Sequence, residues 1–277
     1  MSQSLPPEDA QNGGGISEDR VVVRNTYGEN LIGVLSKTGC RKLVILCHGF
    51  RASKEDRIMV NLSAALTVHG VSSFRFDFSG NGESEGPFQF GNYRKEAEDL
   101  HTVVQYLSKE GYEIIAIVGH SKGGDVVLLY ASMNRDVEAI INLSGRFALQ
   151  DGLEERLGKN YMERVKSDGY VDVKNIKGEV LFRVTDESLM DRLNTDMKAA
   201  ALSIDNKCRV LTVHGSEDEV IPVKDAFEFS KLIPNHKLHI VDGANHCYTG
   251  HQAELASIVV EFIKSIQDEG ACAPRDN

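Results

Sequence analysis

The sequence is poor in the residues that build disulfide frameworks and metal sites. Its five cysteines are Cys40, Cys47, Cys208, Cys247 and Cys272, an odd number with no CxxC pair. Neither a zinc site nor a disulfide framework is therefore expected, and the cysteine beside His246 is interpreted as a packed residue. The chain also has no tryptophan, which removes one common aromatic platform for a ligand.

Long apolar runs are missing as well. No stretch approaches the roughly 18 apolar residues of a membrane span. The N-terminal residues, with Pro6, Pro7 and the glycine run 13–15, lack the apolar core of a secretory signal. We therefore expect a cytoplasmic protein without stable membrane insertion, with a disordered segment at 1–19 and a flexible tail at 269–277.

Positive charge is in deficit. Lysine and arginine total 31 against 41 aspartates and glutamates, which gives a formal net charge of −10. Non-specific binding to nucleic acid or to an anionic membrane needs basic clusters, so neither is expected. The remaining composition, with 41% hydrophobic residues in 277, is that of a globular protein that can bury a full core.

Short apolar runs alternate with helical patterns along most of the chain. Runs at 21–23 and 31–35 flank a turn signal at 27–30, which predicts an opening hairpin. Further strands are predicted at 43–47, 72–76, 114–118, 139–143, 209–213 and 237–241, and helices at 56–69, 93–109, 123–133, 223–232 and 252–266. This alternation predicts an α/β fold with a mostly parallel, doubly wound sheet in one domain over 20–268.

The segment 147–206 interrupts the alternation. It is highly charged and contains a charged helix-like stretch at 187–202. A segment of this length is too long for a plain connection, and such insertions are often functional lids. We therefore predict a cap insertion at about 147–206.

The segment 119–124 reads Gly-His-Ser-Lys-Gly-Gly, directly after a predicted strand and at the start of a predicted helix. In that setting the G-x-S-x-G pattern predicts a nucleophile elbow with Ser121 at its tip. Glycine neighbours allow the strained turn and the close approach of strand and helix. The segment matches neither a phosphate loop nor a dinucleotide-binding spacing. The side chain of Lys122 is therefore expected to face solvent or the rim.

Hydrogen-bond donors for an oxyanion are expected from two loops. Acyl transfer through a tetrahedral intermediate needs two preorganised N–H groups. One is expected from the backbone of Lys122, the residue after the nucleophile, and the other from Phe50 in preference to Gly49, after the strand 43–47. His48, in the same loop, is interpreted as a structural residue.

The acid and the base are expected from the loops after the last two strands. Asp218 follows the strand 209–213, and a short carboxylate there can orient an imidazole. His246 follows the strand 237–241 and suits a base that reaches both Ser121 and Asp218. The order serine, aspartate, histidine is that of α/β-hydrolases.

These motifs resemble the α/β-hydrolase superfamily over residues 20–268. More narrowly, the chain is similar to the feruloyl/cinnamoyl-esterase-like enzymes and their plant relatives, which border on monoacylglycerol lipases and serine aminopeptidase-like hydrolases. The segment 77–84 also matches a D-x-x-G-x-G-x-S turn common in such enzymes, in which Asp77 is expected to brace the turn. Lys122 stands where many cinnamoyl esterases carry glutamine, which leaves the acyl specificity open.

The resemblance also assigns a role to the insertion. It implies that 147–206 covers the acyl pocket and that Tyr161, Tyr170 and Phe182 are candidate substrate contacts. The predicted activity is hydrolysis of a small-molecule carboxylic ester, of an aromatic acid or an acylglycerol, through an acyl-enzyme on Ser121, without a metal or organic cofactor. A thioesterase or acyltransferase with the same triad, and a receptor-like protein with negligible turnover, remain alternatives, and the oligomeric state stays open.

Overall fold

The computed structural model of the chain describes residues 17–272, with side chains up to 267. Most of the predicted disordered segment 1–19 and most of the predicted tail 269–277 lie outside the described residues. The first strand, β1 (Ser17–Arg24), nevertheless begins inside that predicted segment. Its start is held by pairing with β2 (Asn30–Lys37) and by an ion pair of Glu18 with Arg75 at 2.8 Å. Likewise, helix α9 (Gln252–Cys272) runs into the predicted tail.

A twisted sheet forms the centre of the described chain, with the strand order β1-β2-β4-β3-β5-β6-β9-β10. The strands after the hairpin are β3 (Lys42–Cys47), β4 (Ser72–Phe76), β5 (Glu113–His120), β6 (Ala139–Leu143), β9 (Arg209–Gly215) and β10 (His236–Val241). β2 pairs antiparallel with β1 and β4, and the remaining neighbours are parallel. The predicted α/β fold with an opening hairpin and a mostly parallel sheet is confirmed.

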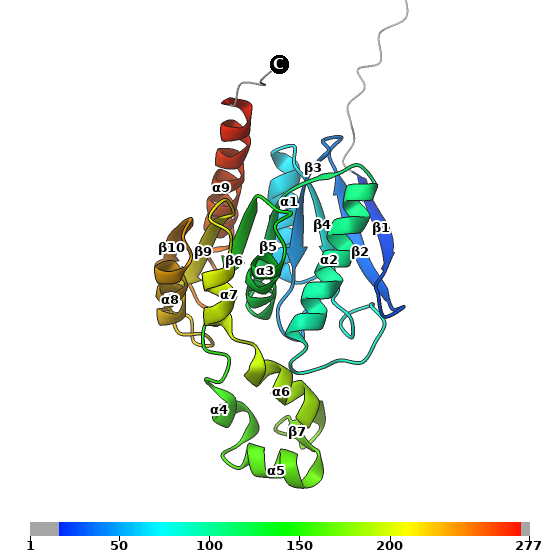
Figure 1. Ribbon diagram of the computed structural model, residues 1–277, viewed down its shortest axis with the longest axis vertical. Coiled ribbons are helices and arrows are strands. Elements are labelled where there is room, and N and C mark those ends of the chain that lie inside the picture. Colours follow the sequence, from blue (N-terminus) through cyan, green and yellow to red (C-terminus); the bar gives the residue numbers. More distant parts are fainter. Residues whose placement is uncertain (1–16, 273–277) are drawn as a thin grey trace, which may run out of the picture.

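Helices cover both faces of the sheet (Figure 1). One face packs against α1 (Arg57–Val68) and α9, and the other against α2 (Tyr93–Lys109), α3 (Lys122–Met133), α7 (Met197–Ser203) and α8 (Lys224–Leu232). The middle strands are apolar on both sides because each side faces a helix layer. No helix within residues 17–272 has both the length and the apolar composition that crossing a bilayer requires.

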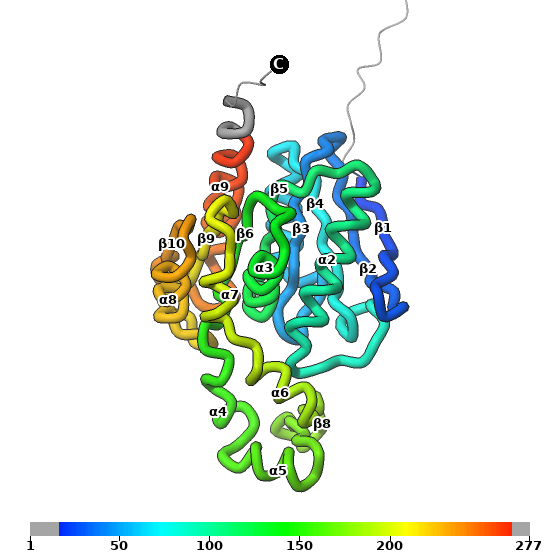
Figure 2. Tube along the Cα trace, in the orientation of Figure 1, coloured from blue at the N-terminus to red at the C-terminus, as the bar shows by residue number. Residues whose placement is uncertain are grey.

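The cap follows the carboxyl end of β6 and projects from one end of the molecule (Figure 1). Its elements are α4 (Leu153–Leu157), α5 (Tyr161–Asp168), the hairpin of β7 (Tyr170–Lys174) and β8 (Val180–Thr185), and α6 (Asp186–Asn194). They enclose a separate apolar cluster around Leu153, Val184 and Leu189, which Phe90 joins from outside the insertion. Figure 2 shows the chain returning from α6 to the sheet.

The predicted helical stretch 187–202 consists of two helices with different partners. α6 ends at Asn194, and a new N-cap forms at Asp196, whose side chain accepts a hydrogen bond from the Ala199 amide at 3.0 Å. The second helix, α7, packs against α3 in the main domain through residues such as Ala200 and Ala201. The part that projects as a cap is therefore shorter than 147–206.

Candidate active site

Ser121 lies in the tight turn between β5 and α3. Its φ of 55° and ψ of −120° fall in a region that non-glycine residues rarely occupy, at a cost of about 1–3 kcal/mol. The turn is held by the Ser121 amide, which donates to the Leu143 carbonyl at 2.8 Å, and by the Gly124 amide, which donates to the Ser121 carbonyl at 2.8 Å. The segment 119–124 thus has the strand–turn–helix geometry of a nucleophile elbow.

Close backbone contacts explain the glycines of this turn. A Cβ on Gly119 would lie 2.1 Å from the carbonyl oxygen of Gly123. A Cβ on Gly123 would lie 2.5 Å from the carbonyl oxygen of His48. Any side chain at either position would therefore push α3 away from the strands that carry the site.

The structure brings together the three side chains proposed from the sequence, Ser121, His246 and Asp218. The Nε2 atom of His246 lies 3.0 Å from Ser121 Oγ, and its Nδ1 atom lies 2.7 Å from Asp218 Oδ2. A carboxylate only accepts hydrogen bonds, so Nδ1 carries the proton and Nε2 is free to accept one from the hydroxyl. His246 is 6% exposed, so its imidazole is largely shielded from water, whereas Ser121 is half-buried.

Asp218 is held as a buried carboxylate. Burial alone would raise its pKa, but hydrogen bonds from His214 and His246 outweigh this effect and lower the pKa well below its usual range. The Ile221 amide donates to the same group at 2.8 Å, and the Val220 amide at 2.9 Å. Asp218 therefore stays ionised and can hold the imidazole in one orientation.

Two other histidines fix the loops around this site. The Nε2 atom of His120 donates to the His246 carbonyl at 2.9 Å, and burial, followed by the charge of His246, lowers the pKa of His120 to about 4. His48 accepts a hydrogen bond from the Phe78 amide at 3.1 Å and donates to the Gly49 carbonyl at 2.8 Å. This placement agrees with the structural interpretation of His48.

Asp77 ties the turn at 77–84 to the loop after β3. Its carboxylate accepts hydrogen bonds from the amides of Lys54, at 2.6 Å, and Glu83, at 2.9 Å, and it pairs with the Lys54 ammonium at 2.9 Å. Because Lys54 belongs to the segment that follows Phe50, the brace also supports the loop that approaches Ser121.

Two backbone amides near Ser121, those of Phe50 and Lys122, are available to donate hydrogen bonds to a ligand. In the part of the chain that the structure describes, neither the Phe50 nor the Lys122 amide has a hydrogen-bond partner. A Cβ built on Gly49 would lie 3.1 Å from Ser121 Cβ, so the Phe50 loop directly adjoins the serine. Lys122 is the first residue of α3, where the helix dipole adds positive potential.

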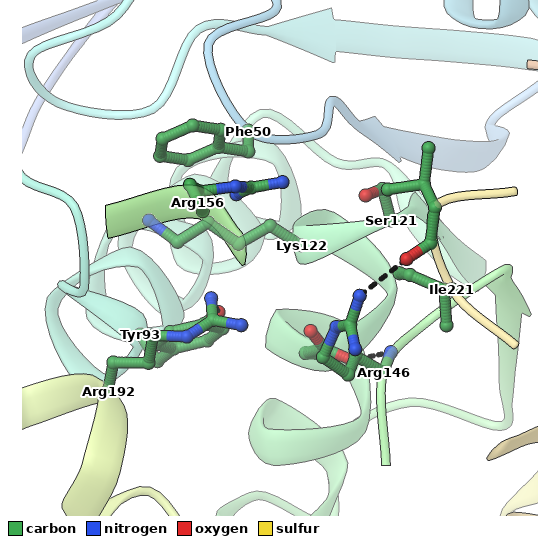
Figure 3. A pocket seen from close by; sticks show the side chains of 10 residues that line it. Phe50, Tyr93, Ser121, Lys122, Arg146, Arg156, Arg192 and Ile221 are labelled. Atoms are coloured by element: carbon green, nitrogen blue, oxygen red, sulfur yellow. Dashed lines mark hydrogen bonds between the residues drawn. The ribbon is translucent and has the colours of Figure 1, made fainter. Parts of the chain in front are cut away.

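A small cavity of about 40 Å³ opens beside Ser121 (Figure 3). It is lined by Phe50, Tyr93, Ser121, Lys122, Asp125, Arg146, Arg156, Arg192, Val220 and Ile221. Three of these are arginines that the sequence analysis did not single out. Arg156 and Arg192 belong to the charged cap, where charge alone is typical of a solvated face, and only the fold shows that they turn inward.

The Lys122 side chain does not face solvent or the rim, and that expectation was wrong. Its ammonium lies 2.7 Å from Glu96 Oε1, and the two side chains are only 7% and 4% exposed. It also lies 5.1 Å from the centre of the Tyr93 ring. Because helix α2 packs against α3, the lysine turns inward to a carboxylate on α2 that no local sequence pattern pairs with it.

The three cap aromatics proposed as substrate contacts do not line the cavity. Tyr170 is exposed and stacks under the Arg183 guanidinium at 3.6 Å, and Tyr161 packs at the edge of the cap cluster. Phe182 is buried against Phe50, with ring centres 5.3 Å apart. The side chains are used for packing within the cap, and Phe182 reaches the site only through Phe50.

No metal site accompanies this arrangement: across residues 17–272, no three His, Cys, Asp or Glu side chains are grouped so that they could hold an ion.

Comparison with known proteins places the chain among hydrolases. Its sequence is similar to YDL057W of Saccharomyces cerevisiae, with 24% identity over 77% of this chain and 70% of the other, and to YfhR of Salmonella typhi, with 30% identity over 72% of this chain and 64% of the other. The fold is similar to that of Est1E from Butyrivibrio proteoclasticus with ferulic acid bound, at a TM-score of 0.78 and 27% identity over 90% of this chain and all of Est1E.

More distant structures share the fold alone. The Pyrococcus furiosus esterase Pf2001 superposes with a TM-score of 0.69 at 21% identity, covering 96% of this chain and 95% of that protein.

The family model for serine aminopeptidase, S33, matches residues 38–201, more than half of the 277 residues. The predicted resemblance is therefore confirmed: the chain is a hydrolase with the α/β-hydrolase fold and belongs to the serine aminopeptidase S33 family.

Proposed function

We propose that the protein is a serine carboxylesterase that hydrolyses small-molecule esters through an acyl-enzyme. The observation that carries the proposal is the continuous hydrogen-bonded chain from Asp218 through His246 to Ser121, with the serine on a strained turn. Strain of this kind persists only where the surroundings enforce it, and it is concentrated at active sites.

In the first half of the reaction, His246 Nε2 takes the proton of the Ser121 hydroxyl as its oxygen attacks the ester carbonyl. Asp218 stabilises the resulting imidazolium, and the amides of Phe50 and Lys122 donate to the oxyanion. His246 then protonates the departing alcohol. In the second half, water activated by the same histidine releases the acid and restores Ser121.

The cytoplasm remains the proposed location. The likeness to Est1E, which holds ferulic acid, makes esters of aromatic acids one class to test. The cap aromatics give that class no direct support, because none of Tyr161, Tyr170 and Phe182 lines the cavity. Glyceryl esters form the second class.

The test combines covalent labelling with turnover. A fluorophosphonate should add one adduct to the wild-type protein, seen by intact mass, and none to Ser121→Ala. Release of p-nitrophenol from short-chain esters should fall by about four to six orders of magnitude in the same variant. Ser203→Ala, an exposed position at the end of α7, is the matched control and should label and turn over like wild type.

The result that contradicts the proposal is a folded wild-type protein that takes no adduct and hydrolyses no ester. An adduct on Ser121 with turnover of thioesters only would replace the carboxylesterase by a thioesterase. Tight ligand binding without product would favour a receptor.

A further inference from the structure

Three guanidinium groups face the cavity beside Ser121 (Figure 3). Arg146 lies in the connection after β6, Arg156 on α4, and Arg192 on α6. Two elements of the cap and one loop of the main domain thus deliver like charges to one small space. Convergence of like charges is unfavourable by itself, and it favours binding of a ligand of opposite charge.

None of these arginines is neutralised by a carboxylate. Within the described residues, none of the three forms an ion pair. Arg192, 7% exposed, instead donates to the Leu149 carbonyl at 2.8 Å and to the Tyr93 hydroxyl at 2.6 Å. Arg146 donates to the Val220 carbonyl at 2.6 Å. These neutral partners orient the guanidinium groups without cancelling their charge.

Three carboxylates around the cavity are weak counter-ions for the arginines. Asp125 also lines the cavity, but burial raises its pKa well above the usual range, and its Oδ1 accepts the Arg146 amide at 2.6 Å. Glu96 is engaged by the Lys122 ammonium. Asp225 accepts the Phe147 amide at 2.9 Å, and burial raises its pKa too.

The arginines also affect one another electrostatically. The pKa of Arg156 is lowered by desolvation and then by the positive charges of Arg192 and Arg146, although part of the residue remains open to solvent. Its guanidinium lies 5.2 Å from the centre of the Phe50 ring. The cavity is therefore electropositive, and a bound anion would relieve this repulsion.

The residues that line the cavity indicate whether it would hold the acyl group or the alcohol of the ester. Ser121 and the two proposed oxyanion donors line it, whereas His246 does not. The departing alcohol must lie beside His246 to receive its proton, so the cavity lies on the side of the acyl group. Its volume of about 40 Å³ suits a group the size of a carboxylate.

We propose that this cavity is an acyl subsite for a carboxylate, and that the preferred substrates are half-esters of short dicarboxylic acids. The proposal rests on the proposed esterase function and specifies its substrate class. Planar guanidinium groups match the geometry of a carboxylate and bind it with charge-assisted hydrogen bonds. The acyl chain runs from Ser121 to the arginines contributed by the cap.

The test compares matched substrates that differ in one charge. The p-nitrophenyl half-esters of succinic and adipic acid are compared with their methyl-capped neutral counterparts. The measured quantity is the ratio of kcat/KM for the charged ester to kcat/KM for the neutral ester. We expect a ratio of about ten or more for the chain length that fits, decreasing at high salt.

Two variants remove the proposed contacts. Arg156→Gln, on an exposed side chain of the cap, and Arg146→Gln should each lower the ratio toward one, by about tenfold, the effect of losing one charge-assisted hydrogen bond. Arg156→Lys keeps the charge and should recover part of the ratio. Arg135→Gln makes the same charge change beyond the far end of α3 and should leave the ratio as in wild type.

The outcomes separate this inference from the esterase proposal. Labelling of Ser121 and turnover of neutral esters, with a ratio near one or a ratio that the Arg146 and Arg156 variants do not change, would overturn the carboxylate subsite alone. If no ester is hydrolysed, binding of monomethyl adipate to Ser121→Ala is measured by calorimetry. Binding that is lost in Arg156→Gln then supports the subsite, and no binding overturns it.

Discussion

The buried ion pair between Lys122 and Glu96 allows a quantitative test of how the site is held together. Replacing Lys122 by methionine keeps the length of the side chain and removes its charge. Glu96 is then left in a nearly dry environment, since it is 4% exposed. Breaking a buried pair from one side typically costs about 3–5 kcal/mol. The change also removes a cation that lies 5.1 Å from the centre of the Tyr93 ring.

The cost should depend on pH in a defined direction. Burial raises the pKa of Glu96 to about 7 even with Lys122 present. A raised pKa means that the folded state binds more protons than the unfolded state from about 4.5 to 7, so this group lowers stability as the pH rises through that window. Without Lys122 the pKa of Glu96 in the folded state should rise further, so the pH window extends upward. Each further pKa unit destabilises the folded state by about 1.4 kcal/mol above pH 7.

The assay is urea unfolding at pH 6 and pH 8.5 of wild type, Lys122→Met, Glu96→Leu and the double variant. Lys122→Met should lose more stability at pH 8.5 than at pH 6. The double variant should be more stable than the sum of the single changes predicts, by about 1–3 kcal/mol, because an apolar pair replaces the ions. Additive single changes and an equal loss at both pH values would refute this account of the pair.

Two further predictions concern the catalytic and titrating groups. Asp218→Asn keeps the shape of the side chain but disfavours the required imidazole tautomer, so kcat should fall by about four orders of magnitude; a variant that retains a tenth of the activity would contradict the role of Asp218. Burial lowers the pKa of His236 to about 4, so the unfolded state binds more protons between about 4 and 6.5 and stability should fall as the pH drops through that range. His236→Gln should remove the contribution of this residue to the slope, at most about 1.4 kcal/mol per pH unit in urea unfolding, and an unchanged slope would refute it.

The sequence predicted the parts of the molecule that local pattern controls. Strands buried on both faces are continuous apolar runs, and the start of α3 is marked by the glycines around Ser121. Asp218 and His246 could be chosen because each follows a strand of a parallel sheet, and such strands carry their loops to one edge. Ser121, Asp218 and His246 all lie outside the cap, so these residues could be chosen without predicting how the cap folds.

Contacts between distant segments could not be predicted in this way. Lys122 was expected to be solvated, because nothing local shows that Glu96, on another helix, lies 2.7 Å away. In the cap, the residues expected to contact a substrate were likewise not the ones that the fold brings to the cavity. The family resemblance suggested Tyr170 and Phe182 as binding residues, yet helices α4 and α6 of the cap bring Arg156 and Arg192 to the cavity instead.

Phe50 joins two parts of the molecule that are otherwise distinct. Its backbone adjoins Ser121, while its ring packs edge-on against Phe90 and Phe182, at 5.6 and 5.3 Å between ring centres. Any displacement of the cap must therefore either carry this loop along or break those ring contacts. Any movement of the cap would therefore also shift the amide that we propose as an oxyanion donor, and we expect substitutions in the cap to affect the chemical step as well as affinity.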